Sequence, residues 1–201
     1  VYNNFPSLND VENYGVSGQL DFDVTDNVTL TSITAYRETS GEFEQDVDFT
    51  SAALLERYNQ QKLETFTQEL RATGQFGPVT ALAGLFYFDE SVREDQQVAY
   101  GGDFRPFANV LTNQLLGQSL TQAEGLLGQL NSGNPAQFIG QFFAAGTIES
   151  GRFTLDNTAL SLFAQLDIEL TDGLTLTLGG NYTMDEKTGA TNYQSTDVFS
   201  N

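Results

Sequence analysis

Apolar and polar residues alternate over two long segments near the end of the chain. Every second position of the first segment is apolar: Leu160, Leu162, Ala164, Leu166, Ile168 and Leu170. The residues between them are polar except Phe163, and the alternation resumes over 174–182 after Thr171-Asp172-Gly173. Because successive side chains of a strand point to opposite faces, this pattern predicts a β-hairpin with one apolar and one polar face.

Similar alternation, in varying strength, predicts six strands in the whole chain. The expected strands cover residues 14–24, 28–44, 64–76, 79–93, 155–170 and 174–187. Short reversals at 25–27, 77–78 and 171–173 join them in pairs, and these contain Asp, Asn, Gly and Pro, which tight turns prefer. The sequence therefore predicts three β-hairpins.

Two long connections separate the hairpins, at residues 45–63 and 94–152. In the first, residues 52–63 are expected to form a short helix. The second has apolar residues at roughly helical spacing over 107–130 and 136–145, which predicts a partly helical loop. A polar tail is expected from Thr188 onward.

Short and long connections alternate strictly, and in an up-and-down sheet this places all short turns at one end and all long loops at the other. That asymmetry is typical of outer-membrane barrels, whereas a soluble sandwich has no reason to sort its loops. Aromatic residues, which form interfacial girdles in such barrels, gather near the expected strand ends: Tyr14, Tyr36, Phe43, Phe86, Tyr87, Phe88, Phe153 and Tyr182. The sequence predicts an all-β, antiparallel, up-and-down transmembrane β-barrel whose apolar face meets lipid.

One hairpin sequence occurs twice. "LDFDVTDNVTLTSITAY" (20–36) aligns with "LDIELTDGLTLTLGGNY" (166–182) at an offset of 146, and eight of seventeen positions are identical. Repetition of one hairpin module is expected of a barrel built from meandering strands.

Composition narrows the possible functions. The chain of 201 residues has 27 acidic and 8 basic residues, a formal net charge of −19, which argues against nucleic acid as a partner. It contains no Cys, which excludes disulfides and thiolate chemistry, and no His, which removes the commonest general base and transition-metal ligand. No signal-type segment and no run of 18 apolar residues is visible, so no transmembrane helix is expected.

Three segments resemble the barrel of TonB-dependent outer-membrane receptors. "FTQELRATG" (66–74) resembles a strand of the form F-x-Q-E-x-R, and "ALAGLFYFDE" (81–90) resembles the following strand, G-x-F-Y. "LFAQLDIELTDGLTLTLGGNYTMDEKTG" (162–189) resembles a later hairpin that contains T-D-x-L-x-L and ends in R-Y-T-x-D-x-K. Asn181 stands where the family usually has Arg.

The resemblance implies a receptor in the outer membrane of a Gram-negative bacterium. Such a receptor binds a scarce extracellular ligand (a siderophore, haem, cobalamin or a glycan) and imports it with energy supplied by TonB. It implies neither an enzyme nor a cofactor. Such barrels have 22 strands around a plug. We therefore expect residues 1–201 to be part of one β-barrel domain, with about six of its strands, which contacts outer-membrane lipid and reaches the TonB complex through a plug domain absent from this chain.

Two sets of candidate site residues follow. The small extracellular ligand is expected to contact the long loop, where aromatic side chains could stack on an apolar or sugar-like molecule: Phe104, Arg105, Phe107, Phe138, Phe142 and Phe143. The alternative is that these residues pack on neighbouring loops. The second set is expected to face the barrel lumen: Glu69, Arg71, Gln165, Asp167 and Asn181. Glu69 and Arg71 could line a ligand path, or they could form a salt bridge that stabilises the wall.

Other chemistry is weakly represented. The acidic runs 42–48 and 89–95 could bind Ca²⁺ but lack EF-hand spacing, so a solvated loop edge is the simpler interpretation. Asp185 and Glu186 are adjacent on a strand and point to opposite faces, so no catalytic pair is expected. No metal site or catalytic residue is predicted. Two alternatives to active transport stay open: a passive porin-like or structural barrel, and a soluble acidic all-β binding module whose apolar face is covered by a second sheet.

Overall fold

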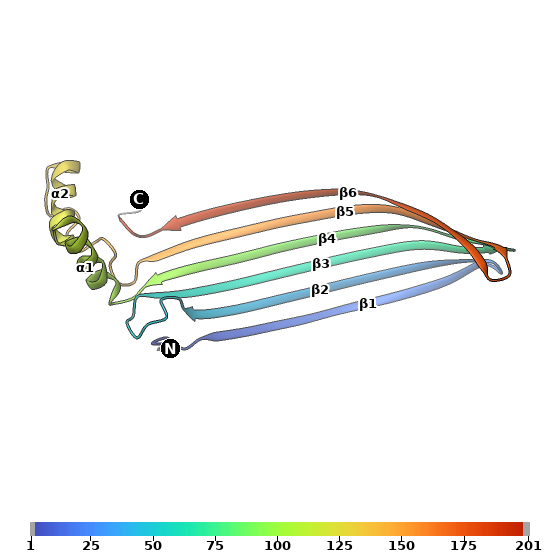
Figure 1. Cartoon of the computed structure of the whole chain (residues 1–201), viewed down its shortest axis with the longest axis horizontal. Coiled ribbons are helices and arrows are strands. Elements are labelled where there is room, and N and C mark those ends of the chain that lie inside the picture. The colour runs from blue at the N-terminus through green and yellow to red at the C-terminus, as the bar shows by residue number, and fades with distance from the viewer. Residues whose placement is uncertain (1–2, 199–201) are drawn as a thin grey trace.

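The computed structural model describes residues 3–198 as one antiparallel sheet with a helical extension at one end (Figure 1). The six strands lie in sequence order, β1-β2-β3-β4-β5-β6, and each pairs with the next along the chain. The bounds are β1 Leu8–Thr25, β2 Val28–Asp46, β3 Leu55–Phe76, β4 Val79–Tyr100, β5 Ile148–Thr171 and β6 Leu174–Ser195. This arrangement confirms the predicted all-β, up-and-down topology; within the described residues the sheet is open, with β1 and β6 as its edges.

Short turns join β1 to β2, β3 to β4, and β5 to β6, as the sequence predicts, and all three lie at the end of the sheet far from the helices (Figure 1). Gly77 and Gly173 occupy two of these turns with φ of 61° and 81°. A side chain at such φ collides with the backbone, so glycine fits these positions best.

The strands extend further than the sequence alternation indicates. β1 begins at Leu8 instead of residue 14, and β3 begins at Leu55, where a short helix over 52–63 was expected. That expectation was wrong. β6 continues to Ser195, through the residues expected to form a polar tail, and β4 continues to Tyr100. Both faces of these extensions carry mostly polar residues, so backbone pairing contributes more to holding them than apolar burial does.

The long connection between β4 and β5 is therefore shorter than expected, residues 101–147, and is partly helical as predicted. It contains α1 Phe104–Leu116 and α2 Leu120–Ser132, separated at Gly117, where the sequence indicated one helical stretch over 107–130. Residues 136–145, also expected to be helical, form turns instead. Neither described helix is long and apolar enough to cross a bilayer.

The register separates an apolar face from a polar face. Directly paired residues of an antiparallel ladder share a face, and the apolar face has the pairs Phe22↔Leu30, Leu70↔Leu85 and Ile168↔Leu176 near the turns. No second sheet or helix covers this face within residues 3–198, and its side chains are exposed: Phe22 by 68%, Leu166 and Leu176 by 42% each. This excludes the sandwich arrangement for the described residues.

The apolar surface is limited to a band next to the turns. In β5 it covers residues 160–170, about 33 Å at ~3.3 Å per residue, or about 25 Å across a membrane at a strand tilt of ~40°. Beyond the band the same face becomes charged, with Lys62 paired to Glu38 at 3.3 Å and to Glu64 at 3.1 Å. A band of this height matches the hydrocarbon-facing surface of outer-membrane barrels.

Candidate functional site

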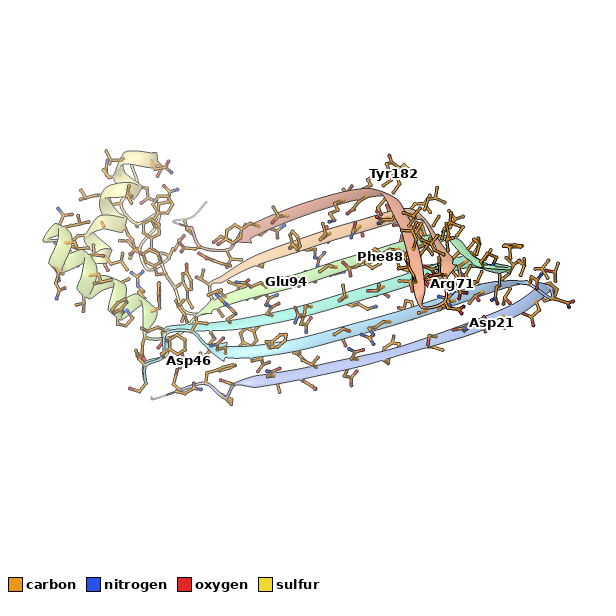
Figure 2. All side chains as sticks on the ribbon, turned by 45° about the vertical axis from the view of Figure 1, so that its right-hand side comes forward. Asp21, Asp46, Arg71, Phe88, Glu94 and Tyr182 are labelled. Atoms are coloured by element: carbon orange, nitrogen blue, oxygen red, sulfur yellow. The ribbon has the colours of Figure 1, made fainter. Side chains whose placement is uncertain are left out.

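The residues expected to face the lumen lie on the polar face of the sheet, opposite Leu166 and Leu176. Arg71 and Asn181 belong to one row across the sheet, through Arg71↔Gly84, Gly84↔Phe163 and Phe163↔Asn181. Glu69 lies two residues from Arg71 on β3, and Gln165 and Asp167 lie on the same face of β5. Figure 2 shows Arg71 in the half of the sheet near the turns. The structure thus brings the five residues onto one face; that this face lines a lumen stays a prediction.

Short polar contacts join four of these residues in two separate pairs, one on β3 and one on β5. Arg71 Nη1 lies 3.3 Å from Glu69 Oε1 in a partly exposed ion pair. Gln165 Nε2 donates to Asp167 Oδ2 at 3.0 Å, and Thr177 Oγ1 donates to Asp167 Oδ1 at 2.6 Å. Of the two interpretations of Glu69 and Arg71, the contacts favour a role in stabilising the wall.

Arg105, a predicted ligand contact, lies in a buried ion pair instead. Its guanidinium donates to both carboxylate oxygens of Glu124, at 2.7 and 2.8 Å, and Nη1 also donates to the carbonyl oxygen of Phe142. Glu124 is completely buried and also accepts from the backbone N–H groups of Gly140 and Phe142, each at 2.9 Å. These contacts join α1, α2 and the turns after α2 into one unit.

No sequence feature distinguishes Glu124, because a single acidic residue between apolar positions of a helix looks like a solvent-facing one. Burial by itself raises the pKa of Glu124, but the hydrogen bonds from Arg105 and from the two backbone N–H groups outweigh it and hold this pKa below its usual range. Glu124 is therefore ionised wherever the loop is folded at neutral pH.

The predicted loop aromatics fall into two groups. Phe104 and Phe143 pack on Tyr100 at the end of β4, with ring centroids 4.5 and 6.3 Å away. Phe142 is 4% exposed and forms the small loop core with Ala108 and Leu120, against which Phe138 packs. These contacts support the packing alternative for most of the set; a role in ligand contact stays a prediction, and Phe107, 45% exposed, is the most accessible member.

Three side chains at the helical end of the sheet were missed by sequence reasoning. Glu149 Oε1 accepts a hydrogen bond of 2.6 Å from the Tyr100 hydroxyl, and Oε2 accepts one of 2.7 Å from the Tyr193 hydroxyl. Burial and this carboxylate raise the pKa of Tyr100, and the hydrogen bond to Glu149 raises that of Tyr193. Both phenols therefore stay protonated and tie β4 and β6 to β5. Tyr100 and Tyr193 lie 49 and 44 positions from Glu149 in the sequence, so no local motif reveals the cluster.

The acidic side chains of residues 3–198 form no cluster of the kind that holds a metal ion. The run 89–95 lies inside β4, not at a loop edge as expected, and most of the run 42–48 lies in β2. The candidate functional surfaces are therefore the polar face of the sheet and the helical loop of residues 101–147 at its end.

Comparison with known protein families agrees with this architecture. The family model described as "TonB dependent receptor-like, beta-barrel" matches residues 1–201. The chain belongs to this family. No curated protein matches the chain significantly.

Membership of the TonB-dependent receptor barrel family explains why the apolar face is uncovered. Members are transport receptors of the outer membrane of Gram-negative bacteria rather than enzymes. In such a barrel the apolar band meets lipid, and short turns and long loops lie on opposite sides of the membrane. The six strands are a barrel wall that does not close within the described residues.

Proposed function

We propose that this protein is an outer-membrane receptor that binds a scarce extracellular ligand and imports it with energy supplied through TonB. The observation that carries the proposal is the uncovered apolar band, about 25 Å high, on a sheet whose other face is polar. A soluble domain would have to bury this band.

The sorting of the connections supports an orientation. The three short turns would face the periplasm, and the connections 47–54 and 101–147 would face the outside, where ligand arrives (Figure 1). Hydrogen bonds join these two loops: Ala53 N–H donates to Asp103 Oδ2 at 2.9 Å, and Gly101 N–H donates to the Leu54 carbonyl at 2.8 Å. The outer loops thus form one connected surface at the entrance.

The test is ligand uptake with and without TonB. Cells that carry the gene should accumulate ligand, or grow on it as a limiting nutrient, only while TonB is present and the membrane is energised. Membrane fractionation in parallel should place the protein with outer-membrane porins and release it only in detergent.

Two outcomes would contradict the proposal. Uptake that persists without TonB would favour a passive porin-like or structural barrel. Recovery of folded protein in buffer without detergent would favour a soluble acidic binding module.

A further inference from the structure

A hollow of about 300 Å³ lies on the polar face of the sheet, between β4, β5 and β6. It is in the half of the sheet nearer the helices, where Figure 2 shows Glu94, and away from the polar contacts around Arg71. Its size is at the lower end of the range for small-molecule sites. Its lining includes Glu94, Gln96, Gly151, Phe153, Thr191 and Tyr193.

Gly151 forms the floor of the hollow. It stands opposite Tyr193 in the β5–β6 ladder and opposite Gln96 in the β4–β5 ladder. A Cβ atom at this position would meet only Tyr193 Cδ2, at 3.9 Å. The space therefore exists because residue 151 has no side chain, and a larger residue would fill it without colliding with the strands.

Two aromatic side chains, Phe153 and Tyr193, line one side of the hollow. Phe153 and Tyr193 are diagonal neighbours on adjacent strands, because Phe153 pairs with Thr191 and Tyr193 pairs with Gly151. They are 41% and 63% exposed, so their faces are accessible. The Tyr193 hydroxyl is held by Glu149, which fixes the ring before any ligand arrives. A fixed ring loses little entropy on binding.

Polar groups with both donors and acceptors surround the rings. Glu94 accepts a hydrogen bond from Asn59 at 2.9 Å through Oε1. Gln96 provides an amide, and Thr191 a hydroxyl, and each of these groups can donate and accept. A ligand that satisfies them must itself carry groups that do both, as alcohol hydroxyls do.

Charge excludes several ligand classes. The one basic residue at the rim, Arg152, lies on the opposite face, where its Nε donates to Asp95. The hollow itself contains two carboxylates, those of Glu94 and Glu149. Anionic ligands are therefore repelled. An organic cation would also suit the charge, and the experiment below therefore includes one as the competing ligand.

We propose that this hollow is a binding site for a neutral carbohydrate. The C–H face of a sugar ring would stack on Phe153 and Tyr193, since polarised C–H bonds are attracted to the negative face of an aromatic ring. The hydroxyls at the ring edge would pair with Glu94, Gln96 and Thr191. This inference rests on the proposed function, because it assigns the ligand class that such a receptor would carry.

The experiment measures binding of neutral trisaccharides of glucose, mannose and xylose to the purified protein in detergent micelles, by saturation-transfer NMR and calorimetry. Wild-type protein should bind at least one of them, with an affinity that does not depend on salt. Gly151→Val and Tyr193→Leu should each weaken binding by at least about tenfold, the effect of losing ~1.4 kcal/mol of contact energy.

Gly189→Val is the matched control. Gly189 lies on the same face of β6, opposite Leu155, and a Cβ there meets its nearest neighbours at 3.6 and 3.8 Å, which are ordinary contacts. This variant should bind like the wild type. Equal loss in both glycine variants, binding of no trisaccharide, or salt-dependent binding of a cationic glucosamine trimer in their place would overturn the proposal.

Uptake measurements separate this proposal from the proposed function. If Gly151→Val leaves TonB-dependent uptake of the trisaccharides unchanged, the carbohydrate site is overturned and the receptor function stands. If Gly151→Val abolishes trisaccharide binding to the purified protein but uptake by cells does not need TonB, the receptor function is overturned and the carbohydrate site stands.

Discussion

Thr31 Oγ1 donates a hydrogen bond of 2.7 Å to Asp21 Oδ1, across the β1–β2 hairpin on the polar face of the sheet. The same bond occurs 146 residues later, where Thr177 Oγ1 donates to Asp167 Oδ1 at 2.6 Å. The repeat seen in the sequence is thus also a repeat of side-chain contacts. In each copy a glutamine two residues before the aspartate donates to its other oxygen, at 2.8 Å from Gln19 and 3.0 Å from Gln165.

The two contacts have the same geometry but differ in burial: Thr31 is 7% exposed, whereas the bond of Thr177 is exposed. Thr31→Val and Thr177→Val should each lower the melting temperature of the protein slightly, and Thr31→Val by more, because each removes one hydrogen bond to a carboxylate and the buried one is harder for water to replace. Heat-modifiable mobility on gels would measure the shift. Double-mutant cycles should detect a stabilising interaction free energy in both hairpins. One cycle combines Asp21→Asn with Thr31→Val, and the other combines Asp167→Asn with Thr177→Val. An interaction in one hairpin alone would show that the repeated contact does not stabilise both copies.

The lipid-facing assignment predicts opposite outcomes for neighbouring residues. Leu162 is 57% exposed in the middle of the apolar band, and Ser161 points to the polar face. Leu162→Arg should destabilise the folded barrel by about 2–4 kcal/mol, the cost of an arginine at the bilayer midplane, whereas Ser161→Arg should cost far less. Urea titration in liposomes would measure both. Equal effects would argue against lipid contact at Leu162.

The buried Arg105–Glu124 pair predicts a strong loss from a single substitution. Arg105→Ala leaves the buried carboxylate without its partner, at a cost of about 3–5 kcal/mol to the local structure. Faster hydrogen exchange and proteolysis within residues 101–147 would report it. The double variant Arg105→Met/Glu124→Leu should recover much of the protection, because an apolar pair leaves no charge buried. Loop protection that survives Arg105→Ala would contradict this role.

The same carboxylate predicts how the loop responds to acid. The folded pKa of Glu124 is lowered, so its contribution is fully present above the unfolded value of about 4.3 and is lost as the pH falls through the folded value. Protection of the loop should therefore be constant from neutral pH down to mildly acidic conditions and decline only below the usual glutamate range. Hydrogen exchange of the loop at a series of pH values, with Glu124→Gln as reference, would measure this. Loss of protection at a pH above the usual glutamate range would contradict the lowered pKa of Glu124.

One glycine in a turn and one in a strand provide a further comparison. Gly173, in the turn before β6, has φ of 81°, and Gly180, within β6, has no atom within 4 Å of an added Cβ. Gly173→Ala should destabilise by about 1–2 kcal/mol because a left-handed backbone is strained for other residues, whereas Gly180→Ala should be neutral or slightly stabilising. Thermal melting of the two variants would distinguish them. Equal stability would mean that the turn relaxes to another conformation.

The sequence alone determined the strand alternation, the three turns and the two faces of the sheet. These depend on local properties: a side-chain period of two, and the backbone freedom of Gly, Asp and Asn. The apolar band also follows from the sequence, since Leu162, Leu166 and Leu176 are apolar wherever the neighbouring strands lie, whereas the lack of a covering layer over residues 3–198 is a finding of the structure. The family resemblance came from the same segments, 66–74, 81–90 and 162–189.

Tertiary structure decided the strand ends and every contact between distant residues. Beyond the apolar band both faces of the strands are mostly polar, so the alternation weakens in the sequence while the backbone ladder continues, and β3 extends to Leu55. Glu124 became buried because Arg105 and two backbone N–H groups meet it in space. The hollow over Gly151 exists because register places Tyr193 opposite a residue without a side chain, and register between strands is a property of the assembled sheet.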